Sequence, residues 1–207
     1  MKRPLLLLTI LRLGGCLGTA PPVPRDHFYR ILVPQPAATA EEPRLPGVVS
    51  VPPLEADGLL RERPLVFSAS GRAHEMQQYD YHHWTDPPNR MLQRQLVGYL
   101  RQSGLAESVV TPDLRVRPDY EVVGRIKRLE RLLGGDRPRV HAELELALVR
   151  LADGRMLVID SYAVERSSAG DGIGAAVMAL NQAIAEIFDR FLADTRQTTL
   201  AIRPEPG

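Results

Sequence analysis

The feature that most constrains the fold is a run of three consecutive segments with the pattern of long β-strands. The segments are Tyr120–Leu133, Pro138–Leu151 and Met156–Arg166. In the middle segment, apolar residues from Val140 to Leu148 alternate with polar ones, which are His141, Glu143 and Glu145. Because successive strand residues point to opposite faces, this alternation predicts one buried and one solvated face. Turns rich in glycine and aspartate, at 134–136 and 152–154, predict an antiparallel meander.

Two other segments have the apolar spacing of amphipathic helices. The first begins at Asp86 and Pro87, where a carboxylate can accept free amide hydrogens and proline is tolerated, and it stops at Gly104. The second runs from about Gly172 to Asp194, with its apolar residues on one face. The sequence therefore predicts an α+β fold, in which an antiparallel β-sheet carries two amphipathic helices packed on one face and the other face is more polar.

Before the first helix, runs of β-branched and aromatic residues between turn signals predict four shorter strands. They are 28–33, 47–51, 64–69 and 73–81. We expect a single domain over residues 26–195, followed by a C-terminal tail at 196–207. The formal net charge of +1 in 207 residues gives no sign of a nucleic-acid partner.

The chain begins with the features of a secretory signal peptide, which we assign to residues 1–15. A positively charged start precedes the apolar run Leu5–Leu11. A membrane-spanning helix needs about 20 apolar residues, so this run is too short to be one. The following segment, Leu13–Cys16, is similar to the lipobox of bacterial lipoproteins, in which the cysteine receives a diacylglyceryl group. The sequence thus predicts export followed by lipidation.

We predict that Cys16 is the lipidated N-terminus of the mature protein and that a flexible tether follows it over residues 16–25. Cys16 is the only cysteine, so no disulfide can form within the chain, which suits the oxidising periplasm. Leu17 stands where inner-membrane lipoproteins commonly carry aspartate. We therefore expect a lipid anchor in the outer membrane, facing the periplasm, with the inner membrane as the alternative.

No sequence motif indicates catalysis, and we predict no enzyme activity, no cofactor and no metal site. The glycine-rich segment 170–174 opens a helix, but the second strand that a dinucleotide-binding fingerprint requires is missing. His82 and His83 are adjacent and point to opposite sides of an extended chain, so they cannot easily share one metal ion. An aromatic packing cluster around Trp84, the only tryptophan, is the simpler interpretation.

Two groups of residues are candidates for an interface with a partner. The first lies at the corner between strand and helix and consists of Tyr81, His83 and Trp84. The second consists of arginines on the first helix, Arg90, Arg94 and Arg101. These arginines form either a solvated basic face or a docking stripe for acidic residues of a partner or for lipid headgroups.

Several pieces of the chain match a known pattern, and the most specific is Trp84-Thr85-Asp86-Pro87 with the helix after it. The other pieces are Cys16, Phe28–Leu32, Leu65–Phe67, Tyr79, Leu100–Gly104 and Ala179–Ala183. With these pieces the sequence resembles the ABC-type transport auxiliary lipoproteins, the family that includes the paraquat-inducible intermembrane transport lipoprotein. The resemblance covers nearly the whole mature chain.

This resemblance implies a non-enzymatic, membrane-anchored subunit that acts beside an MCE-domain protein, an ABC permease and an ATPase in moving lipids between the inner and outer membranes. It also implies assembly as a homo-oligomeric ring around the MCE component. Two alternatives stand beside it. One is a periplasmic carrier that holds a phospholipid in an apolar groove between helix and sheet, and the other is a periplasmic enzyme, which no motif supports.

Overall fold

The computed structural model describes residues 23–37, 45–69, 72, 74–134 and 137–202. The predicted signal peptide and Cys16 lie outside the described residues. Nine strands and two α-helices follow one another along the described part of the chain. They are β1 (His27–Tyr29), β2 (Leu45–Ser50), β3 (Glu55–Ala56), β4 (Pro64–Ala69), β5 (Met76–Trp84), α1 (Pro88–Gln102), β6 (Ala106–Val110), β7 (Tyr120–Leu133), β8 (Arg139–Arg150), β9 (Arg155–Ser167) and α2 (Ile173–Ile202).

These nine strands form one sheet in which β7 is central. On one edge of β7, β8 pairs antiparallel with it and β9 pairs antiparallel with β8, so that Leu144 lies opposite both Ile126 and Tyr162. The predicted meander is therefore confirmed. At the periphery, β5 pairs antiparallel with β4, whereas β1 runs parallel to β5 and β6 runs parallel to β2.

The other edge of β7 is lined by β2, β3 and β4, all parallel to it. They pair in turn with Tyr120, Arg125 and Glu130, like successive pieces of one interrupted strand. Pro52 and Pro53, which have no amide hydrogen for a strand ladder, separate β2 from β3. The α+β class is thus confirmed, but the sheet is mixed, because sequence alternation indicates which face a strand buries and not which neighbour it pairs with.

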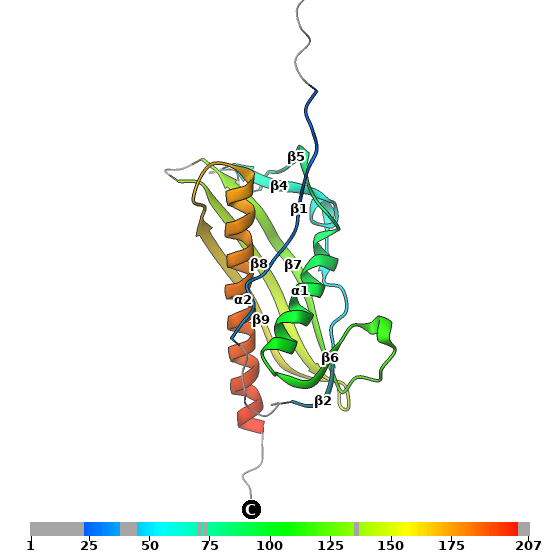
Figure 1. The fold of residues 1–207 in the computed structure, drawn as a ribbon. Coiled ribbons are helices and arrows are strands. Elements are labelled where there is room, and N and C mark those ends of the chain that lie inside the picture. Colours follow the sequence, from blue (N-terminus) through cyan, green and yellow to red (C-terminus); the bar gives the residue numbers. More distant parts are fainter. Residues whose placement is uncertain (1–22, 38–44, 70–71, 73, 135–136, 203–207) are drawn as a thin grey trace, which may run out of the picture.

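Both helices pack on the same face of the sheet, as predicted (Figure 1). α2 lies against β8 and β9, and α1 lies against β6. The core between these layers contains fully buried side chains from both helices and from β8, among them Leu96, Leu144, Ile184 and Phe188. α2 continues to Ile202, beyond its predicted end at Asp194.

The start of α1 differs from the prediction. The helix begins at Pro88, and no side chain caps its first turn. Asp86, expected to be the cap, instead accepts a hydrogen bond from Nη2 of Arg94 at 2.6 Å. Pairing with a full positive charge satisfies this carboxylate better than a neutral amide would.

The N-terminal segment is a strand only at β1, although its β-branched and aromatic residues predicted a strand over residues 28–33. Beyond β1 the chain runs between α1 and α2 (Figure 1). The amide of Leu32 donates to Oδ1 of Asn181 on α2 at 3.1 Å, and the amide of Val33 donates to Oε1 of Gln95 on α1 at 2.9 Å. Side chains of the two helices thus take the place of a neighbouring strand. We call residues 31–33 the strap.

Candidate functional site

Trp84 is 2% exposed and belongs to the hydrophobic core. It is the last residue of β5, pairs with Tyr29 of β1, and its amide donates to the carbonyl of Arg63. A partner cannot reach this ring, so the interface role considered for it is corrected to the packing role. The indole fills the corner where β5 leads into α1.

The other two residues of the predicted corner lie at the surface or close to it. Tyr81 is exposed. The half-buried ring of His83 contacts Phe28, and its Nε2 lies 3.6 Å from a carboxylate oxygen of Asp26. These contacts join β5 to the residues that precede and form β1, so His83 helps to fix the N-terminal segment.

His82 has a separate set of neighbours. Its ring stacks on His27 at 5.1 Å between centroids, and its Nδ1 lies 2.9 Å from the hydroxyl of Tyr29. Burial lowers the pKa of His82, and the nearby His27 and His83 lower it further. The two adjacent histidines therefore act at different contacts between β1 and β5.

The three arginines of α1 do not form one free stripe. Arg101 donates from Nε to the carbonyl of Val109 at 2.7 Å and so fastens α1 to β6. Arg94 is paired with Asp86. Arg90 is exposed, and its guanidinium has no ion pair or hydrogen bond with any described residue. Arg90 and Arg101 therefore keep a full charge that a partner could use, whereas the charge of Arg94 is partly offset by Asp86.

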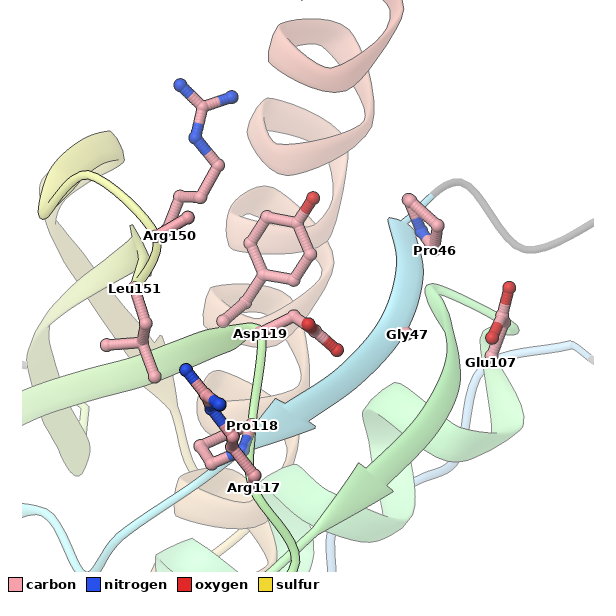
Figure 2. A pocket seen from close by; sticks show the side chains of 10 residues that line it. Pro46, Gly47, Glu107, Arg117, Pro118, Asp119, Arg150 and Leu151 are labelled. Atoms are coloured by element: carbon pink, nitrogen blue, oxygen red, sulfur yellow. The ribbon is translucent and has the colours of Figure 1, made fainter.

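Sequence reasoning missed an open cavity of about 780 Å³, which we call the end cavity. It lies where β7 begins and β8 ends, at the opposite end of the sheet from β1 (Figures 1 and 2). Its lining residues are Pro46, Gly47, Glu107, Arg117, Pro118, Asp119, Tyr120, Arg150, Leu151 and Ala152. Because these residues come from turns and strand ends, no periodic pattern in the sequence marks them.

Asp119 holds the wall of the end cavity together. Its Oδ2 accepts from the amide of Val48 at 2.8 Å, and its own amide donates to the carbonyl of Val48 at 2.9 Å. Its carbonyl accepts from the amide of Leu151. Gly47 makes this possible, because it has a φ of 87° and a Cβ there would lie 2.1 Å from Oδ2 of Asp119.

The charges around the end cavity have both signs. Arg150 binds Asp153 through two hydrogen bonds of 3.0 and 2.6 Å, and this pairing lowers the pKa of Asp153 to about 2. Arg117 and Glu107 are exposed and have no ion pair with any described residue. The lining thus combines charged side chains of both signs with apolar ones, which are contacts that a bound protein chain can use.

A second group of charges lies on the sheet face opposite the helices, which we call the open face. Glu130, only 1% exposed, accepts from Nε of Arg128 at 2.5 Å. Glu143 accepts from Lys127 and from Ser161. These bonds link β7 to β8 and β8 to β9 across the open face.

His141 was predicted on a solvated face, but it is 8% exposed. It is the cross-strand partner of Glu130, and further charged side chains, among them Arg128, lie near its ring. Neither ring nitrogen has a hydrogen-bond partner, although Nδ1 lies 3.5 Å from Glu165 and Nε2 lies 3.9 Å from Glu143. Burial first, and then Arg128, lowers the pKa of His141 against the opposing effect of the carboxylates.

Neither group of charges forms a metal centre in the described part of the chain. Within those residues, no three histidine, cysteine, aspartate or glutamate side chains are arranged to hold a metal ion. No helix among the same residues is long and apolar enough to cross a membrane.

Comparison with known proteins agrees with the fold. A crystal structure of a protein from Xanthomonas campestris is similar with a TM-score of 0.74 and 21% identity, over 85% of this chain and 98% of that one. A crystal structure of an uncharacterized protein is similar with a TM-score of 0.66 and 14% identity, over 82% and 98% of the two chains. At these identities the similarity establishes the fold alone.

None of the curated proteins matches this chain in sequence. The sequence model of a protein family does match it, and the match spans residues 29–191, from β1 to the middle of α2. That range includes the strap, the corner at Trp84 and the end cavity. The chain therefore belongs to the ABC-type transport auxiliary lipoprotein component family.

Proposed function

We propose that this protein is a non-catalytic docking or assembly subunit of an MCE-type ABC transport system that moves lipids between the inner and outer membranes. The observation that carries the proposal is the family match over residues 29–191. The end cavity supports it, because its lining offers charged and apolar contacts to a protein partner. In such a system the ATPase supplies the energy and the permease supplies the passage through the membrane. This subunit would hold its partner protein in position.

The proposed location is the periplasmic face of the outer membrane, with Cys16 as the lipidated residue. The described chain enters the fold at β1, at the opposite end of the sheet from β2 and β6 (Figure 1). The end cavity lies at this other end, where β7 begins and β8 ends. An anchor before β1 would hold one end of the domain towards the membrane. The end cavity would then be presented towards the MCE-domain partner.

The direct test is recovery of the MCE-domain protein with the tagged full chain from detergent-extracted envelopes. We expect the two proteins to copurify, and absence of association both in detergent and after crosslinking in cells would refute the proposal. Arg117→Glu is expected to reduce recovery severalfold, because a reversed charge repels the partner's complementary group. Arg137→Glu is the matched control, since Arg137 is also exposed but lies near the opposite end of β8.

A ring of identical subunits is the assembly we propose for the protein on its own. Native mass spectrometry of the detergent-solubilised full chain measures this directly. A single closed stoichiometry is expected, whereas a monomer at all concentrations would limit the proposal to one subunit per MCE assembly.

The lipid-carrier alternative requires an apolar groove between helix and sheet. The described chain puts its own strap between α1 and α2, with the side chains of Ile31 and Val33 buried. We therefore favour docking over carriage. Mass spectrometry of the purified full chain separates the two, because a carrier retains a stoichiometric phospholipid besides its own acyl groups.

A further inference from the structure

Beside α1 there is a cleft of about 330 Å³ that the proposed docking role does not use. Its lining residues are Arg30, Ile31, Leu32, Thr85, Asp86, Met91, Arg94 and Gln95. The cleft lies between α1 and the chain that leads from β1 into the strap. We call it the arginine cleft.

Donors outnumber acceptors in the arginine cleft. Arg30 is exposed and has no ion pair or hydrogen bond with a described residue, whereas Arg94 is joined to Asp86 by one bond from Nη2. Gln95 accepts from the amide of Val33 with Oε1, so its side-chain amide hydrogens remain for another acceptor. Arg90, one helical turn before Arg94, adds a further unpaired cation. Three arginines and one carboxylate make this surface complementary to anions.

An apolar group accompanies these cations. Leu32 is 62% exposed at the edge of the cleft. It cannot turn inwards, because the neighbouring Ile31 and Val33 are buried and the amide of Leu32 is held by Asn181. A fixed apolar side chain beside arginines suits the boundary between lipid headgroups and acyl chains.

The position of the cleft along the chain points to the same partner. Arg30 follows Cys16 by fourteen residues, and a fully extended chain of that length reaches at most about 50 Å. A lipid at Cys16 would therefore keep the arginine cleft close to a bilayer surface. Anionic headgroups would be present there at a high local concentration.

We propose that the arginine cleft receives the phosphate groups of anionic phospholipids in the membrane that anchors the protein, with Leu32 contacting the acyl boundary. This inference rests on the proposed lipidation of Cys16. The arginine cleft lies on one side of α1. Binding of headgroups there would therefore determine which face of the domain meets the bilayer.

The test places a fluorophore at Leu32. Lipidation consumes the only natural cysteine, so Leu32→Cys in the full chain gives one reactive thiol. The protein is reconstituted in vesicles of phosphatidylcholine with about one third phosphatidylglycerol, and quenching by headgroup spin-labelled lipid is measured. Strong quenching is expected at position 32. Ile159→Cys, 56% exposed on β9, is the matched control and should be quenched weakly.

Charge variants complete the test. In the Leu32→Cys background, Arg30→Gln is expected to lower the ratio of docked to undocked domains about fivefold. Arg155→Gln, at the exposed first residue of β9, should leave the ratio unchanged. Equal quenching at positions 32 and 159, or no effect of Arg30→Gln, would overturn the proposal. So would an Arg30→Gln protein that docks normally on vesicles but loses its MCE-domain partner.

Two further readouts separate this inference from the proposed function. The mass of the N-terminal peptide reports whether Cys16 is acylated, and copurification reports whether the transport partner binds. A protein that is acylated and binds its partner but shows no quenching at position 32 refutes the cleft proposal alone.

Discussion

At the scale of the residue, Trp84 has the largest expected effect on stability. Its indole is buried in the core where β5 leads into α1. Trp84→Ala is expected to lower the free energy of unfolding by about 3–5 kcal/mol, because it leaves a cavity and removes apolar contacts. Urea denaturation measures this change. Tyr81→Ala, three residues away and exposed, is the control and should change stability by less than about 0.5 kcal/mol.

Gly47 gives a second prediction for a single residue. Gly47→Ala combines a positive φ with a collision against Asp119, so it should cost about 2–3 kcal/mol and open the wall of the end cavity. Gly58 also has a positive φ, of 53°, but a Cβ there meets nothing within 4 Å. Gly58→Ala is therefore expected to cost about 1 kcal/mol, from backbone strain alone. Equal losses in the two variants would show that the contact with Asp119 is unimportant.

At the scale of the element, the two helices are joined by few contacts, and one of them is polar. Tyr99 of α1 donates its hydroxyl hydrogen to Asp189 of α2, and its ring packs edge-on against Phe188. Burial and the bond to Asp189 raise the pKa of Tyr99.

Removing this link tests its contribution. Tyr99→Phe keeps the ring but removes the hydroxyl, so we expect a loss of about 1–2 kcal/mol in the free energy of unfolding. Tyr81→Phe is the matched control, because no described residue bonds to the hydroxyl of Tyr81, and it should have no effect within error. If the Tyr99→Phe protein is as stable as the parent, the hydrogen bond to Asp189 does not stabilise the fold and the contact between the helices depends on packing alone.

The elements that could be predicted are those with a local periodicity. The meander of β7, β8 and β9 and the two helices each repeat their apolar pattern over ten residues or more, so the pattern identifies both the element and its buried face. β6 was not predicted, because its five residues, AESVV, are too short for a period. The strap has the residue types of a strand, but the acceptors for its backbone amides are side chains from residues far along the chain.

The candidate sites were less accessible to prediction. Asp119 and Gly47 form a wall only because β2 pairs with β7, and this parallel pairing leaves no trace in either segment. Arg94 was identified, but its partner Asp86 was assigned to the helix cap. His141 was predicted to be solvent-exposed because the other residues on its strand face are polar. In the structure it is buried, because ion-paired side chains such as Arg128 and Glu130 lie on that face.

At the scale of the whole molecule, two histidines link stability to pH. The pKa values of His82 and His141 are both lowered by burial from 6.5. The unfolded chain then binds more protons than the folded chain as the pH falls through about 6.5, so the free energy of unfolding must fall with it. Above that pH both histidines are neutral in either state and the effect vanishes.

This pH dependence can be measured by urea denaturation between about pH 7.5 and about pH 5. We expect stability to decrease over this range and the decrease to shrink in His141→Leu, which also removes two buried nitrogens without hydrogen-bond partners. A His141→Leu protein with the parental slope would mean that His141 does not titrate in this range.

The strap has a mechanical consequence for the molecule. The residues before β1 lead directly into a chain that is paired with β5 and then held by one side chain from each helix. Tension applied at the N-terminus therefore reaches β1 first, a three-residue strand at the edge of the sheet. The strap behind it would pass the load on to both helices through Asn181 and Gln95, so the force would not stay on the sheet edge alone.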